Sequence, residues 1–88
     1  MTYSVLVEGS AQRQLEKLDK SIQIIIVKKL VQMESKKIGR HLKHGSPFFV
    51  EEIGQYRIAF KVLDANKEKK VYFIGDHKEY EKWYNQFF

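Results

Sequence analysis

Residues 48–75 read FFVEEIGQYRIAFKVLDANKEKKVYFIG, and this stretch decides the fold. Apolar runs at 48–53, 56–63 and 70–75 are separated by the short breaks Gly54-Gln55 and 64–68, a spacing that predicts three strands joined by tight turns. In the middle run, apolar residues alternate with Arg57, Ala59 and Lys61, as on a strand with one buried face. We therefore expect an antiparallel meander that carries Arg57 and Lys61 on its less apolar face.

The residues before the meander predict one strand and two helices. Thr2 to Glu8 alternates with the period of a strand, and Ser10 is a suitable N-cap for a short helix that follows. A second helix is expected from 22 to 36, because Ile22, Ile26, Leu30 and Met33 form one helical stripe. The segment from 37 to 47 contains two glycines and a proline, which is typical of a loop.

The residues after the meander predict one more helix. Asp76 and Glu79 have the spacing of a capping box, and Tyr80, Trp83, Tyr84 and Phe87 then recur at helical intervals. Helices and strands are segregated along the chain, which favours an α+β class. We expect a small single domain over 1–88, with an N-terminal strand, a helical hairpin packed on a mostly antiparallel four-stranded sheet, and a C-terminal helix.

Composition narrows the classes of function. The chain has 88 residues, a net charge of +5 and no cysteine, which excludes a disulfide framework and a thiolate metal site and favours the cytoplasm. No apolar stretch is long enough to cross a membrane, and the N-terminus does not resemble a signal peptide, so we expect no membrane partner.

The positive charge is densest between 36 and 44. Lys36, Lys37, Arg40 and Lys43 occur there with no acid among them. Such a patch suits a polyanion such as RNA, although a solvated basic helix end would have the same composition. His41 and His44 lie in the same segment, but its lysines would repel a metal cation, so we expect neither a metal site nor a cofactor.

The remaining chemistry suits a phosphodiester. Histidine is a common acid or base in catalysis, so His77 is a candidate for proton transfer, Arg57 can hold a phosphate, and Tyr80 or Trp83 can stack on a base. Each residue also has a plainer interpretation. A first-turn histidine is usually solvated, a strand arginine usually pairs with a carboxylate such as Glu51 or Glu52, and an aromatic helical stripe usually belongs to a core.

The order of these motifs resembles the RelE/ParE superfamily of type II toxins. The resemblance rests on the strand and Leu-x-x-Leu helix of 3–19, on Ile53-Gly-Gln-Tyr-Arg-Ile-Ala-Phe60, and on Phe73-Ile-Gly-Asp-His-Lys-Glu-Tyr80. It implies a toxin that cuts mRNA on the translating ribosome, needs no metal, and is held inactive by a cognate antitoxin in a hetero-oligomer. It also implies that Arg57 is the catalytic strand arginine and that His77 occupies the position of a catalytic Arg, Lys or His.

The same resemblance leaves three points open. The catalytic C-terminal tyrosine could be Tyr80, or its place could be taken by Trp83 or Tyr84, and these three residues with Lys61 extend the expected RNA-binding face. Glu51 and Glu52 stand where RelE-like members carry lysines, which weakens phosphate binding there. The ParE branch shares the fold but inhibits DNA gyrase, so a non-catalytic module remains the alternative, beside a plain nucleic-acid-binding domain.

Overall fold

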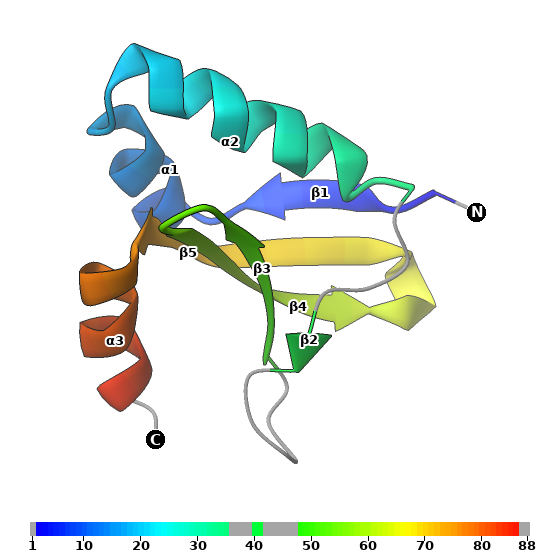
Figure 1. The fold of residues 1–88 in the computed structure, drawn as a ribbon. Helices are drawn as coiled ribbons and strands as arrows, with labels where there is room; N and C mark the ends of the chain where they lie inside the picture. The colour runs from blue at the N-terminus through cyan, green and yellow to red at the C-terminus, as the bar shows by residue number, and fades with distance from the viewer. Residues whose placement is uncertain (1, 36–39, 42–47, 87–88) are drawn as a thin grey trace.

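A computed structural model describes residues 2–35, 40–41 and 48–86. Figure 1 shows helices and strands in the order β1(Ser4–Val7), α1(Gly9–Glu16), α2(Lys20–Gln32), β2(Arg40–His41), β3(Phe48–Ile53), β4(Tyr56–Leu63), the 3-10 turn η1(Asp64–Asn66), β5(Glu68–Asp76) and α3(His77–Asn85). The predicted α+β class, the helical hairpin and the four longer strands are confirmed. The fold differs from the prediction in the details described below.

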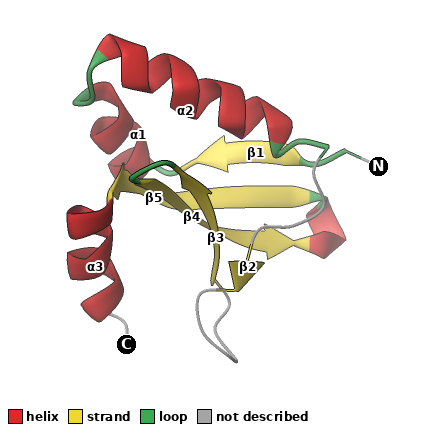
Figure 2. Ribbon diagram, in the orientation of Figure 1, coloured by secondary structure: helices red, strands yellow, loops and turns green. Residues whose placement is uncertain are grey.

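The described strands form one sheet in the order β1-β5-β4-β3-β2. β3, β4 and β5 are the antiparallel meander expected from residues 48–75, and β1 lies parallel to β5. Figure 2 shows the hairpin of α1 and α2 on one side of the sheet, while α3 leaves the end of β5 on the other side. The sheet therefore has one face covered by two helices and one face covered in part by α3.

The face under the hairpin holds the hydrophobic core. Ile26, Leu30 and Met33 of the predicted stripe are buried against Ile58 and Phe60 of β4. Burial of apolar side chains at about 25 cal/mol per Å² is the main force that holds such layers together. The periodicity of α2 thus identified the correct helix face.

A buried lysine also lies on this core face. Lys69 is only 1% exposed, and its ammonium donates a hydrogen bond to the carbonyl oxygen of Met33 at 2.7 Å. It also lies 5.0 Å from the centre of the Tyr3 ring, which adds a cation–π contact. The third strand was expected to begin at Lys70, but it begins at Glu68, because Lys69 pairs with Val62 and is anchored at the end of α2.

Several other boundaries differ from the prediction: β1 spans Ser4–Val7 rather than 2–8, and α2 spans Lys20–Gln32 rather than 22–36. Helix α1 begins at Gly9 with Glu8 as its N-cap, so Ser10 lies inside the helix and was wrongly expected to be the cap. The reason is that the carbonyl oxygen of Glu8 already accepts the first helical hydrogen bond, from the amide of Gln12 at 2.8 Å. In the predicted loop, Arg40 and His41 form β2 by pairing with Val50 and Phe49; the rest of that segment lies outside the described residues.

Candidate functional site

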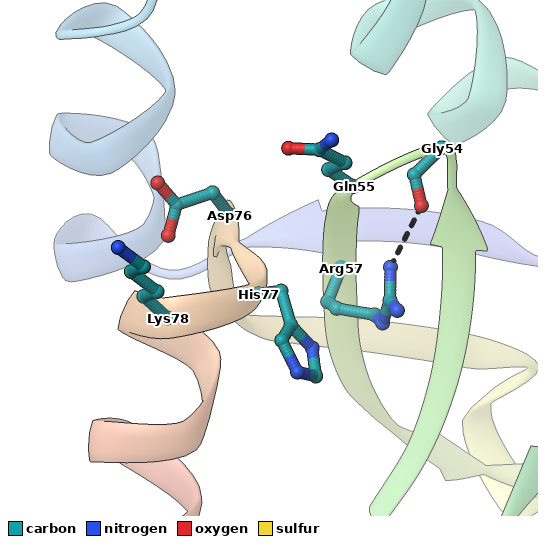
Figure 3. A pocket seen from close by; sticks show the side chains of 6 residues that line it. All are labelled: Gly54, Gln55, Arg57, Asp76, His77 and Lys78. Atoms are coloured by element: carbon teal, nitrogen blue, oxygen red, sulfur yellow. Dashed lines mark hydrogen bonds between the residues drawn. The ribbon is translucent and has the colours of Figure 1, made fainter.

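A pocket of about 550 Å³ lies where the β3–β4 turn meets the start of α3. Its lining residues are Gly54, Gln55, Arg57, Asp76, His77 and Lys78 (Figure 3). Pairing of Arg57 with Gly75, and of Tyr56 with Asp76, brings the start of β4 beside the end of β5. The sheet register therefore places the predicted residues Arg57 and His77 at one pocket.

The capping box at the start of α3 fixes the direction of this helix. The carboxylate of Asp76 accepts a hydrogen bond from the amide of Glu79 at 2.9 Å, and the carboxylate of Glu79 accepts one from the amide of Asp76 at 3.3 Å. This confirms the predicted capping box. Because His77 is the first residue of α3, the same box fixes where its side chain leaves the backbone.

Arg57 is held over the β3–β4 turn. Its Nη1 donates to the carbonyl oxygens of Gly54 at 2.9 Å and Tyr56 at 3.0 Å. Its Nε lies 3.6 Å from Oε2 of Glu52, which directly opposes it across the two strands. Of the two carboxylates weighed from the sequence, Glu52 is thus the partner of the strand arginine, and Glu51 instead lies buried within 3.6 Å of Lys29 on the opposite face.

The β3–β4 turn owes its shape to a glycine. Gly54 has a φ of +57°, in the left-handed region that glycine enters at little cost. This conformation closes the hairpin in two residues, so that Ile53 pairs with Tyr56 and Glu52 with Arg57. The turn therefore supplies the carbonyl oxygen of Gly54 and sets the register that brings the carboxylate of Glu52 beside the guanidinium.

His77 is more accessible than Arg57. Its side chain is 56% exposed, compared with 16% for Arg57. Its Nε2 lies 3.3 Å from Oε1 of Glu81, one turn further along α3. Figure 3 shows the imidazole on the Arg57 side of the helix, whereas the guanidinium is directed to Gly54. The two side chains thus line the same pocket but have different partners: the imidazole lies beside Glu81, and the guanidinium lies beside Glu52 and Gly54.

The aromatic residues of α3 lie outside this pocket and form a cluster on the sheet. Trp83 stacks on Phe73 with ring centres 5.4 Å apart and meets Phe48 edge-on at 5.1 Å. Tyr80 lies 6.0 Å from Phe73 and 6.1 Å from Tyr84. Three residues of the predicted stripe, Tyr80, Trp83 and Tyr84, therefore pack α3 on β5 and are half-buried rather than fully displayed to a ligand, whereas Phe87 lies outside the described residues.

The predicted RNA-binding lysines are only partly described. Lys61 lies on the Arg57 face of β4, with its ammonium 5.0 Å from the Phe48 ring and 5.1 Å from the Tyr72 ring. Lys36, Lys37 and Lys43 lie outside the described residues, and Arg40 is placed in β2 by its backbone alone. The geometry of the basic segment at 36–44 stays a prediction.

Sequence reasoning missed Gln55 and Lys78 as lining residues of the pocket. Lys78 directly follows His77, and Gln55 lies two positions before Arg57, so the signal was nearness in sequence to these residues rather than a motif. Within the described residues, no cluster of three metal-ligating side chains occurs. No helix there is long and apolar enough to span a membrane.

Several solved structures share this architecture. A chain of the toxin–antitoxin complex RelBE2 from Mycobacterium tuberculosis superposes with a TM-score of 0.78 at 20% identity, covering 86% of this chain and 99% of that one. A mutant of the Escherichia coli toxin RelE in the free state gives a TM-score of 0.79 at 19% identity, covering 96% of this chain and 93% of that one. The chain has a RelE-like fold.

A third similarity extends this RelE-like fold to the archaea. A chain of the RelE–RelB complex from Pyrococcus horikoshii OT3 gives a TM-score of 0.65 at 17% identity, covering 88% of this chain and 97% of that one. No protein-family model matches the sequence, and no curated protein does either. The RelE-like fold predicted from the order of the motifs is thus confirmed by structure, at identities where sequence comparison alone finds nothing.

Proposed function

We propose that this protein is the toxin of a type II toxin–antitoxin system and that it cleaves mRNA on the ribosome. The main support for the proposal is that Arg57 and His77 line one pocket of a RelE-like fold. Fold alone does not fix an activity, so the proposal depends on the chemistry of these two side chains. Action on the ribosome would place the protein in the cytoplasm.

The proposed reaction is attack of a ribose 2′-OH on the adjacent phosphorus. The 2′-oxygen loses a proton to a base, the bond to the 5′-oxygen breaks as that oxygen gains a proton from an acid, and a 2′,3′-cyclic phosphate forms. His77 is exposed enough to reach the ribose and can serve in either proton transfer. Arg57 would stabilise the charge that develops on the phosphate oxygens. Tyr80, one turn beyond His77, is the proposed second proton-transfer group, and this role requires its ring to turn from Phe73 toward the pocket.

Induced expression followed by primer extension on an abundant message tests this proposal. We expect the parent chain to produce new 5′ ends inside translated codons. Arg57→Ala and His77→Ala should each remove these ends, whereas Arg13→Ala, which deletes an exposed arginine on α1, should keep them. Equal soluble levels of all four chains make the comparison valid. If both pocket variants arrest growth as strongly as the parent, the mechanism is wrong.

The engagement of Arg57 favours a second candidate function. Its Nη1 is bound to the turn and its Nε faces Glu52, an arrangement that suits a RelE/ParE-fold module without nuclease activity. Such a module would be a gyrase inhibitor of the ParE type or a toxin that has lost its activity. It predicts intact messages, accompanied either by inhibited gyrase supercoiling or by normal growth.

We also propose a cognate antitoxin as partner. Two of the three structures named above are complexes, a toxin–antitoxin complex RelBE2 and a RelE–RelB complex, and Arg57 of the pocket here lies on the face that the helical hairpin leaves uncovered. We expect an amphipathic antitoxin segment to cover Arg57 and His77, because masking the active face is the simplest way to inhibit it. Slower modification of His77 by diethyl pyrocarbonate in the complex would support this. Unchanged reactivity would show that the antitoxin binds elsewhere.

A further inference from the structure

A carboxylate stands beside the arginine that the proposed reaction needs. Glu52 and Arg57 are direct cross-strand partners in β3 and β4, with Oε2 of Glu52 3.6 Å from Nε of Arg57. The side chain of Glu52 is 44% exposed, so water can solvate its carboxylate and the charge does not require a cation beside it. The effect of Glu52 on this pocket therefore depends on how its carboxylate changes the binding capacity of the Arg57 guanidinium.

The guanidinium has few donors left for an anion. A guanidinium binds a carboxylate or phosphate with two parallel N–H groups, along either the Nη1–Nη2 edge or the Nε–Nη2 edge. Nη1 of Arg57 already donates to the carbonyl oxygens of Gly54 and Tyr56, which occupies the first edge. A phosphate that binds bidentately must therefore use the Nε–Nη2 edge, and Oε2 of Glu52 lies 3.6 Å from Nε, one of the two nitrogens of that edge.

We propose that Glu52 is an internal competitor of the phosphate at Arg57. Its carboxylate occupies the position of one phosphate oxygen and repels a second anion, so the resting pocket binds RNA phosphate weakly. The proposal rests on the proposed function only in taking RNA phosphate as the ligand. In the cleavage reaction Glu52 would be a positioning residue that acts through Arg57 and has no contact with the reacting atoms.

The test is a binding measurement that needs no catalysis. A fluorescein-labelled single-stranded decamer of 2′-O-methyl RNA cannot undergo the reaction, because its 2′-oxygens carry no proton. Its affinity is measured by fluorescence anisotropy for the full-length parent, for Glu52→Gln and for Glu34→Gln. Glu34 is exposed and lies just beyond α2, beside Tyr3 at the Glu68 end of β5, whereas the pocket lies at the Gly75 end. This control removes the same charge and reports the effect of net charge alone.

We expect Glu52→Gln to bind roughly three- to tenfold more tightly than Glu34→Gln, the range for freeing one exposed charge-assisted contact. The same substitution in an Arg57→Ala background should produce no gain beyond the control. Equal affinities for Glu52→Gln and Glu34→Gln would overturn the proposal. So would a full gain without Arg57, or weaker binding by Glu52→Gln, which would make Glu52 a support for the arginine.

Primer extension with the same variants separates this inference from the proposed function. If no variant creates new 5′ ends but Glu52→Gln still tightens binding through Arg57, the nuclease proposal fails and the competitor role stands. If Arg57-dependent ends appear but Glu52→Gln binds no better than its control, the competitor role fails and the nuclease stands. If both hold, Glu52→Gln should also arrest growth at a lower level of induction than the parent.

Discussion

Substitution of Gly75 by alanine is expected to destabilise the protein through one identifiable clash. A Cβ atom at this position would lie 2.7 Å from Cζ of Phe73 and 3.0 Å from Oε1 of Glu79. Ordinary contact begins at 3.4 Å, so the Phe73 ring would have to move by about 0.7 Å. That ring is 2% exposed and stacks on Trp83, and it therefore has little freedom to move.

Two effects of Gly75→Ala should lower the free energy of unfolding, and one should raise it. Overpacking of a filled site costs about 1–3 kcal/mol, and displacement of Glu79 from the capping box adds up to about 1 kcal/mol. Loss of a glycine from the unfolded chain returns about 0.4–1 kcal/mol. We expect a net loss of about 2 kcal/mol, which for a domain of this size corresponds to a fall in Tm of roughly 8–16 °C.

The assay is urea unfolding followed by circular dichroism, with two controls. Gly54→Ala should also destabilise, by about 1–2 kcal/mol, but through its φ of +57°, since nothing lies within 4 Å of a Cβ there. Asparagine tolerates that φ, so Gly54→Asn should recover much of the loss, whereas Gly75→Asn should not. In a Phe73→Leu background, which lacks the clashing ring atoms, Gly75→Ala should cost less. A Gly75→Ala protein as stable as the parent would refute the reasoning.

Three further predictions concern single contacts. Lys29→Met should lower the unfolding free energy by up to about 3 kcal/mol in urea titrations, because it removes the ammonium that lies 3.6 Å from the 7%-exposed carboxylate of Glu51; Glu51→Gln added to it should restore part of the loss. Asp76→Ala should cost about 1 kcal/mol and speed amide exchange in the first turn of α3. The hydrogen bond to Asp64 raises the pKa of Tyr3 above 10.0, so its contribution to stability is present below pH 10.0 and is lost as pH rises through the folded pKa. Tyr3→Phe should therefore flatten the alkaline limb of the stability curve, and an unchanged limb would contradict this.

Local patterns were sufficient to predict the helices and the capped start of α3. The stripe of α2 and the Asp76–Glu79 spacing each depend on residues within a few positions of one another. The burial of Lys69 could not be predicted in this way. Its ammonium is bound by the carbonyl oxygen of Met33, 36 residues away, and only the assembled fold brings that oxygen to the strand. Sequence reasoning normally assigns a strand lysine to solvent.

The partner of Arg57 was accessible to sequence reasoning in principle. A two-residue turn at Gly54-Gln55 requires Ile53 to pair with Tyr56, and one step further along the strands Glu52 must oppose Arg57. Glu51 and Glu52 are both possible partners by charge, but alternation places Glu51 on the opposite face. The length of the turn and the period of the strand are therefore sufficient to decide between the two carboxylates.

The pairing of β4 with β5 could not be derived so simply, and the pocket depends on it. The register shifts between Ala59 and Phe60, so that Tyr72 is the extra residue of a β-bulge. In an unshifted ladder Arg57 would oppose Ile74, whereas the shift places Gly75 there and leaves Ile74 in the core against Ile58. A glycine beside Arg57 leaves room for Phe73 and Glu79, and α3 then begins with His77 at the pocket. The bulge thus allows Ile74 to be buried in the core while Arg57 and His77 line the same pocket.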